Sequence, residues 1–154
     1  MDKCKRVVQK FVYRGETGDG SEHGFIIPSP NFHLDFDPQN NLWVTNPGMH
    51  AIQQYNDLGE LTESWSKSSP EIEGFSGCCN PAKFTFLPDG RFITSEKGLV
   101  RIKIYSASGE FESVVAAPEK FTEDGEALDL AVDKQENIIA LDENKKMIRF
   151  FKPI

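Results

Sequence analysis

An internal repeat constrains the fold of this chain more than any other feature of its sequence. Residues 34–65 align without gaps on residues 84–115, at an offset of 50, and a third copy follows the second at an offset of 46. A partial copy opens the chain, at an offset of 44 from the first. Such periods are typical of architectures in which similar units stack side by side. Identities between the first two copies include Phe36/Phe86, Pro38/Pro88, Gly48/Gly98, Ile52/Ile102, Tyr55/Tyr105 and Gly59/Gly109.

Each unit contains four short segments rich in β-branched and aromatic residues, separated by turn sequences such as Pro88-Asp89-Gly90. No segment sustains a helical period of 3.6, and Gly and Pro are frequent. Four strands in 40 to 50 residues are typical of a β-propeller blade. The sequence therefore predicts an all-β chain of about three four-stranded blades, in a single domain. Its expected units are a partial blade (1–28), two blades (29–70 and 71–120) and a second partial blade (121–154).

The repeat resembles that of the NHL family of propellers. The likeness lies in LDFDPQNNLWVTNPGMHAIQQYNDLGE, FTFLPDGRFITSEKGLVRIKIYSASGE and LDLAVDKQENIIALDENKKMIRFF, and it covers nearly the whole chain. GFSGCCNP, followed by PDGRFITSEKG, resembles a bacterial subgroup with a G-C-C-N-P stretch, in which the positions of Ser76 and Ser95 are often cysteine. The resemblance implies a propeller but not one activity, since NHL propellers include binding platforms and enzymes.

About three blades cannot close a ring, because closed propellers have four to eight. Two interpretations follow. The chain is the C-terminal half of a six-bladed propeller whose N-terminal half is missing, or two copies close a six-bladed ring as a homodimer. Both predict exposed apolar end faces that drive association. The first interpretation is favoured, because the chain begins in the middle of a blade.

Charge and hydropathy exclude some partners. The net charge is −7, and the only basic cluster is the short segment from Lys3 to Arg6, so no nucleic-acid partner is expected. No apolar run has the length of a transmembrane helix or a signal peptide, so no membrane partner is expected either. The chain is cytoplasmic if Met1 is the true start, and exported if a leader has been lost.

The links between blades should carry any ligand site. In a propeller, the links from fourth to first strands and from second to third strands emerge on one face, which we call the loop face. The first strands bring His33, Lys83 and Asp129 to equivalent positions at the mouth of the channel, where they could bind a polar ligand, relay protons or pair with one another. The candidate ligand-binding residues on this face are His33, His50, Cys78, Cys79, Asn80, Lys83, Glu96, Lys97 and Asp129.

The adjacent cysteines Cys78 and Cys79 leave three interpretations open: a vicinal disulfide, ligation of a soft metal, or two thiols in a compact loop. The third is preferred, because the loop offers few further ligands. Zinc could bind His23, His33 and His50, but only His33 lies at a channel position. The sequence therefore predicts no metal and no cofactor. Glu96 shares a repeat position with Asn46 and Asp142, where we expect side chains that cap backbone amides.

These observations favour a binding scaffold over an enzyme. The chain lacks G-x-S-x-G, H-E-x-x-H and a phosphate-binding loop. The expected partner is a protein or a small molecule held by the loop face. The alternative is a propeller-type hydrolase or lyase, with a metal or an acid/base residue at the channel mouth.

Overall fold

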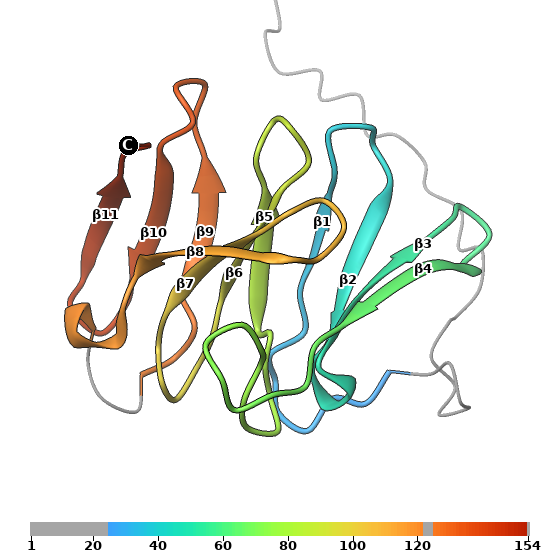
Figure 1. Cartoon of the computed structure of the whole chain (residues 1–154), viewed down its shortest axis with the longest axis horizontal. Helices are drawn as coiled ribbons and strands as arrows, with labels where there is room; N and C mark the ends of the chain where they lie inside the picture. Colours follow the sequence, from blue (N-terminus) through green and yellow to red (C-terminus); the bar gives the residue numbers. More distant parts are fainter. Residues whose placement is uncertain (1–24, 122–124, 154) are drawn as a thin grey trace, which may run out of the picture.

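The computed structural model describes residues 25–121 and 125–153, which form three antiparallel sheets arranged side by side (Figure 1). The prediction of an all-β chain with four-stranded units is confirmed. The first sheet contains β1 (Leu34–Phe36), β2 (Leu42–Asn46), β3 (Ala51–Tyr55) and β4 (Leu61–Ser66); the second contains β5 (Lys83–Phe86), β6 (Phe92–Ser95), β7 (Ile102–Tyr105) and β8 (Phe111–Ala116); the third contains β9 (Asp129–Val132), β10 (Ile138–Asp142) and β11 (Met147–Phe151).

Turn chemistry fixes where each hairpin reverses. The first hairpin of every sheet has a residue with positive φ at the same repeat position, namely Asn40 (66°), Gly90 (90°) and Glu136 (60°). In two of these hairpins an aspartate stabilises the reversal: Asp37 Oδ1 accepts the amide of Asn41, and Asp133 Oδ1 accepts the amide of Asn137, each at 2.8–2.9 Å. Local side-chain hydrogen bonds of this kind favour turns over continued strands.

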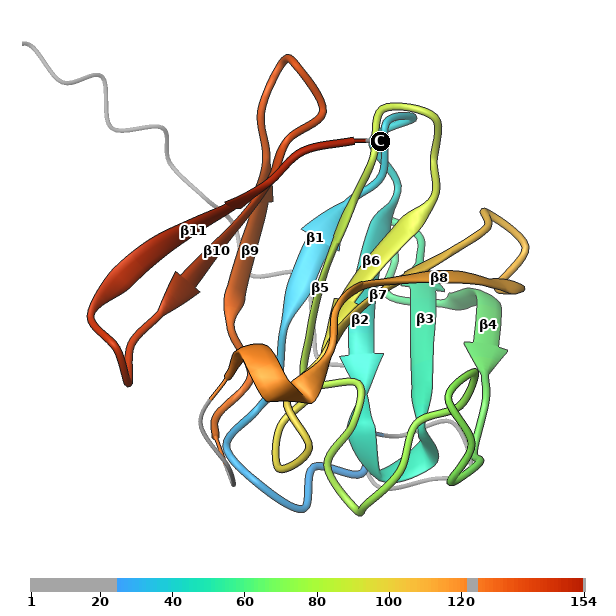
Figure 2. The ribbon, with the colours of Figure 1, turned by 60° about the vertical axis from the view of Figure 1, so that its left-hand side comes forward.

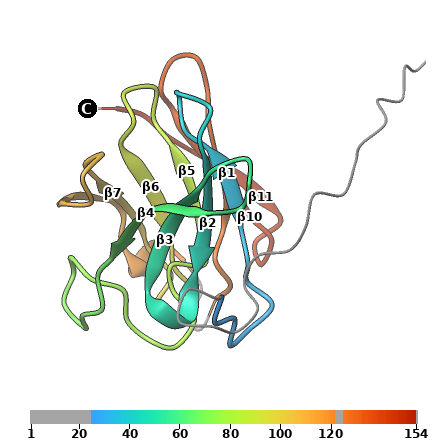
Figure 3. The same cartoon turned by 90° about the vertical axis from the view of Figure 1, so that its right-hand side faces the viewer.

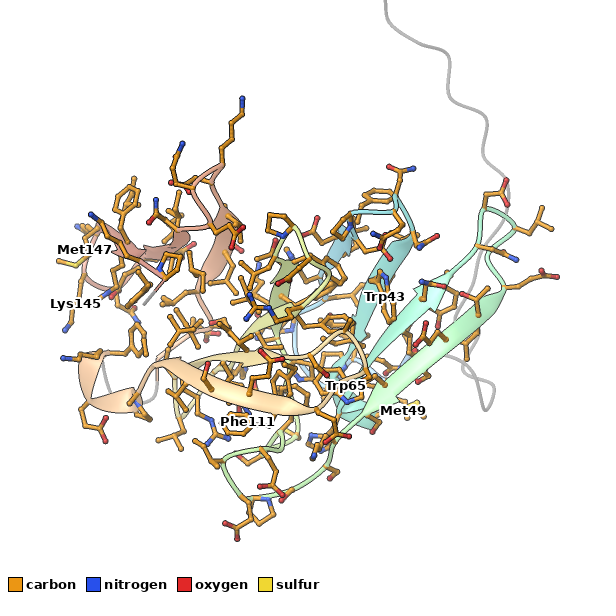
Figure 4. The ribbon with its side chains drawn as sticks, turned by 45° about the horizontal axis from the view of Figure 1, so that its top comes forward. Trp43, Met49, Trp65, Phe111, Lys145 and Met147 are labelled. Carbon is orange, nitrogen blue, oxygen red and sulfur yellow. The ribbon has the colours of Figure 1, made fainter. Side chains whose placement is uncertain are left out.

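The core lies between the sheets. Trp43, Phe84, Phe86 and other aromatic residues fill the space between the first and second sheets, together with Ile52. Trp43 and Trp65 both lie in this aromatic region (Figure 4), as expected from their strand positions. A second, more aliphatic cluster fills the space between the second and third sheets; it includes Ile93, Val100, Ile102, Leu128, Ile138 and Ala140.

The first strands of the three sheets run side by side, because β5 packs beside both β1 and β9 (Figure 2). The third sheet bends away from the other two in this view. Three kinds of connection lie at one end of the strands: the link to β1, the links between sheets and the links from β2 to β3 and from β6 to β7 (lower part of Figure 1). This end is the loop face, and the hairpins between first and second strands lie at the opposite end.

Parts of two expected units lie outside the described residues. The partial blade expected at 1–28 is described only from Phe25, so His23 lies outside it, and residues 122–124 and 154 of the partial blade expected at 121–154 are not described. Among the described residues, no helix is long and apolar enough to cross a membrane.

Candidate functional site

The three residues expected at the channel mouth do come from adjacent strands. Lys83 opens β5 and Asp129 opens β9, and Lys83 Nζ lies 2.7 Å from Asp129 Oδ1. His33 directly precedes β1, and its ring packs edge-on against Phe84, with centroids 5.5 Å apart. The ion pair is partly exposed, so it contributes little to stability. The group is therefore a small polar surface with one imidazole, one amine and one carboxylate.

The imidazole of His33 is held in its neutral form at neutral pH. Burial lowers its pKa below the usual 6.5, the charge of Lys83 lowers it further, and the carboxylates of Asp129 and Asp35 act in the opposite direction. Below pH 6.5 the folded chain therefore binds fewer protons at His33 than the unfolded chain, and this group makes stability fall as pH falls. A neutral imidazole can accept a proton or a hydrogen bond from a ligand.

Substitutions of Lys83 and of Asp129 should move the pKa of His33 in opposite directions. Lys83→Met removes a positive charge and should raise this pKa, whereas Asp129→Asn removes a negative charge and should lower it. The pKa can be measured by following the imidazole C–H signals by NMR between about pH 4 and 8, with His33→Gln to assign the signal. Equal pKa values in the two variants would contradict this account of the site.

A polar pair recurs in every sheet between the end of the second strand and the third strand. We call it the blade clasp; its members are seven positions apart and occupy equivalent repeat positions. In the first sheet the clasp is a hydrogen bond between amides, and in the other two it is an ion pair. The pairs are Asn46 Nδ2 to Gln53 Oε1 at 3.0 Å, Lys103 Nζ to Glu96 Oε1 at 2.7 Å, and Arg149 Nη2 to Asp142 Oδ2 at 2.8 Å.

The capping expected at the first position of the clasp is confirmed in two sheets and wrong in the third. Asn46 Oδ1 accepts the amide of Ile26, and Asp142 Oδ1 accepts the amide of Lys145, both at 2.9 Å. Glu96 instead receives hydrogen bonds from Arg101 Nε and Nη2, both at 2.9 Å, in addition to Lys103. The longer side chain reaches past the local amides to two cations.

The clasp of the second sheet is fully buried and holds an inter-sheet loop. Glu96, Arg101 and Lys103 are nearly inaccessible to solvent. Lys103 Nζ also donates to the carbonyls of Ile72 (3.1 Å) and Gly74 (2.7 Å), so the cations fix residues 71–75 against β7. Glu96, one of the candidate ligand-binding residues, thus already serves two internal partners.

Burial gives Lys103 an unusual titration. Desolvation lowers its pKa from 10.5 to about 8, against the opposing attraction of Glu96. Between these values the unfolded chain binds more protons at this position than the folded chain, so this group makes stability rise with pH. Lys103→Met should remove that rise and should also lower stability near pH 7, because the buried carbonyls of Ile72 and Gly74 lose their donor. Glu96 keeps Arg101 as a partner in this variant.

The measurement is urea unfolding of both proteins at several pH values between about pH 7.5 and 9.5. The difference between them isolates Lys103 from other groups that titrate in the same range, such as the cysteine thiols. Tyr105, whose pKa burial raises, is present in both proteins, so its effect on the slope is shared by them. A parallel pH dependence in the two proteins would show that Lys103 does not titrate there.

His50 contributes a second feature of the loop face. Its Nδ1 atom is buried and has no hydrogen-bond partner among the described residues. The residue lines a shallow cavity of about 270 Å³ whose other walls come from the link between the first and second sheets. Such unsatisfied buried atoms are uncommon in folded proteins. The other lining residues are Ser68, Ser69, Pro70, Phe75, Ser76 and Gly77.

A larger hollow of about 610 Å³ lies elsewhere. It is bordered by β8 and β11, the outermost strands of the second and third sheets, and its lining is mainly apolar. None of the nine candidate residues lines it. We therefore attribute it to the open outer edge of the third sheet rather than to the loop-face site.

The remaining candidates form a compact loop around the cysteines. The Cys78 and Cys79 sulfurs lie 3.1 Å apart; Cys78 is exposed and Cys79 is buried. Asn80 is buried and fastens this loop to the next one: its Nδ2 donates to the carbonyls of Ser76 (2.9 Å) and Lys97 (3.1 Å), and its Oδ1 accepts the amide of Lys97 (2.9 Å). Asn80 and the backbone of Lys97 therefore serve the shape of the loop.

Sequence reasoning placed the loop face but missed several residues. The sequence analysis does not single out Arg101 or Lys103, although the seven-residue spacing from Glu96 to Lys103 recurs in the aligned repeats. The serines that line the His50 cavity have no counterpart in the other repeats, so the repeat pattern could not reveal them. The structure brings His33, Lys83 and Asp129 together, whereas His50 lines a separate cavity.

Comparison with known proteins bears on the fold. No protein-family model matches the chain, and no curated protein matches it significantly. One solved structure that resembles it is a virginiamycin B lyase from Staphylococcus aureus, with 16% identity and a TM-score of 0.48 over 82% of this chain and 43% of that one. Another is a streptogramin B lyase, with 18% identity and a TM-score of 0.51 over 84% of this chain and 44% of that one. A third is a protein of unknown function from Bacteroides caccae, with 11% identity and a TM-score of 0.49 over 82% of this chain and 48% of that one.

These identities support conclusions about fold alone. The chain spans less than half the length of each of the structures that it resembles. With its three radially arranged antiparallel sheets, it has the architecture of part of a β-propeller.

Proposed function

We propose that this chain is an NHL-type partial propeller that acts as a binding scaffold, and that a small polar ligand binds on its loop face beside His50. The observation that carries the proposal is the buried Nδ1 of His50, which no described residue hydrogen-bonds, in a residue that lines a serine-rich cavity. A ligand hydroxyl or amine would form hydrogen bonds with Ser68, Ser69 and Ser76, and its donor would reach the buried Nδ1 of His50 only after the side chains that cover this atom move. Apolar contact would come from Phe75 and Pro70, as in most small-molecule sites.

An NMR screen with small polyols, amines and sugars tests this proposal. Ligands should shift the signals of His50 and residues 68–77, and His50→Ala should abolish these shifts. Lys134→Met, in the hairpin at the opposite end of the strands, is the matched control and should leave binding intact. Ligands that bind His50→Ala as well as the parent would contradict the assignment.

We further propose that the scaffold is complete only when other blades cover its two end faces, in a six-bladed ring formed by a second copy or by a separate N-terminal half. The first and third sheets each lack a neighbouring sheet on one side among the described residues (Figures 3 and 2). Positions on these two sides are exposed, whereas their repeat equivalents between sheets are buried. The repeat equivalents give the contrast directly: 57% exposure for Leu34 against 0% for Phe84, 51% for Phe36 against 8% for Phe86, and 60% for Ile148 against 0% for Ile102.

The mass of the purified chain in solution tests this proposal. Exposed apolar patches of this kind usually mark association surfaces. A dimer supports ring closure by two copies. A chain that aggregates alone, but forms a single species when a separate N-terminal half is added, supports closure by that half. A chain that stays monomeric, soluble and cooperatively folded at high concentration would contradict both forms of the proposal.

A propeller-type lyase is the second candidate, because the neutral His33 beside Lys83 and Asp129 could act as a general base. Virginiamycin B and other streptogramin B compounds, named in two of the similar structures, provide the assay. Turnover followed by mass spectrometry and lost in His33→Gln would support a lyase. No turnover by the assembled protein would leave the scaffold as the proposed function.

A further inference from the structure

The geometry points to a bidentate thiol site at Cys78 and Cys79 for a soft, three-coordinate centre of the trivalent arsenic class. The two sulfurs converge to 3.1 Å on the loop face, where Cys78 is exposed and Cys79 is buried. This inference is independent of the proposed ligand beside His50.

The separation of the sulfurs argues against a disulfide. A disulfide needs the sulfurs at about 2.05 Å and usually joins Cα atoms at least about 4.4 Å apart, whereas neighbouring residues across a trans peptide are fixed at about 3.8 Å. The peptide between Cys78 and Cys79 is trans. Closing the bond would therefore require distortion, whereas binding one atom between the sulfurs would not.

The same separation argues against tetrahedral zinc. If a metal ion bonds to both sulfurs at about 2.3 Å, the zinc–sulfur distance, and the sulfurs are 3.1 Å apart, the sulfur–metal–sulfur angle is about 85°. Tetrahedral zinc requires about 109°, which corresponds to a sulfur separation of about 3.8 Å. A trivalent arsenic centre is pyramidal, with bond angles much closer to a right angle, and it is soft enough to prefer sulfur.

The surroundings prepare the pair for such a centre. Asn80 fixes the loop on both sides through its hydrogen bonds to Ser76 and Lys97. The loop therefore loses little conformational entropy when it binds a ligand. A hydrogen bond from Ser29, another from Cys78 and the charge of Lys97 lower the pKa of the Cys79 thiol against the effect of burial. Cys78 is exposed and gives access from solvent.

The reaction with an arsenical needs no oxidant. With phenylarsine oxide as the probe, two S–H bonds break and two As–S bonds form, and the oxygen leaves with both protons as one molecule of water. Arsenic remains trivalent and its phenyl group remains attached. The product is a chelate that a monothiol displaces poorly and a small dithiol displaces readily.

The test uses the full chain carrying Cys4→Ser, because Cys4 is the third cysteine and lies outside the described residues. One equivalent of phenylarsine oxide should add one phenylarsenic group per chain by intact mass and consume two thiols. Dimercaptopropanol should reverse the addition. Cys78→Ser and Cys79→Ser, each in this background, should bind the probe at least about 100-fold more weakly, since each removes the second, effectively intramolecular bond.

Two controls keep the outcome unambiguous. Cys78 is exposed, so Cys78→Ser should fold normally, and circular dichroism checks this for both variants. Zinc should bind the parent more weakly than the arsenical does. The inference is overturned if the parent takes up no arsenic, if either single variant binds it as tightly as the parent, or if zinc binds with equal affinity.

Discussion

Replacing Glu96 with glutamine is expected to lower the free energy of unfolding by about 3–5 kcal/mol, because the substitution leaves two buried cations without a compensating charge. Glu96 contacts both Arg101 and Lys103 at 2.7–2.9 Å, and all three side chains are nearly inaccessible to solvent. Glutamine keeps the size of the side chain, so the loss reports charge rather than packing.

Asp142→Asn is the matched control, because Asp142 occupies the same repeat position in the third sheet. Its partner Arg149 is more exposed, so water can solvate the arginine left behind, and the cost should be smaller. Urea unfolding of the parent and both variants measures the difference. In addition, Lys103→Met should recover part of the stability lost in Glu96→Gln, because it removes one of the two uncompensated cations. A loss below about 1 kcal/mol for Glu96→Gln would show that the cluster does not stabilise the sheet.

Phe86→Ala should cost about 3–5 kcal/mol, whereas Phe36→Ala, at the equivalent position one repeat earlier, should cost under about 1 kcal/mol in an isolated chain. Phe86 packs between the first and second sheets, with ring centroids 4.8 Å from Phe92 and 6.1 Å from Trp43. Phe36 lies on the uncovered side of the first sheet and is half exposed. The two variants differ only in whether a neighbouring sheet covers the ring.

The pair also tests assembly. If further blades cover the first sheet in solution, Phe36→Ala should weaken association, with a rise in the dissociation constant measured by sedimentation. Urea unfolding at protein concentrations below and above the dissociation constant separates the effect on chain stability from the effect on association. Equal costs for Phe36→Ala and Phe86→Ala in a protein shown to be monomeric would contradict the described packing.

Sequence reasoning succeeded where the repeat enforced regularity. The four-stranded units, the reversal at Pro88-Asp89-Gly90, and the approach of His33, Lys83 and Asp129 all follow from placing equivalent residues in equivalent blades. It was less successful at Glu96, because this repeat position holds a longer side chain in the second sheet than in the other two. One more methylene than Asp142 carries the carboxylate to Arg101 and Lys103, and no propensity or period encodes that distance.

The sequence by itself determined the strands, their order and their alternation, because those depend on local periodicity and turn chemistry that each repeat carries within itself. Only the tertiary structure decided which polar groups lose contact with water. The buried cluster at Glu96, the unpartnered Nδ1 of His50 and the convergence of Cys78 on Cys79 arise where irregular links pack against the sheets. Their energetics depend on desolvation and on distances of a few ångströms between loops, which a linear pattern does not specify.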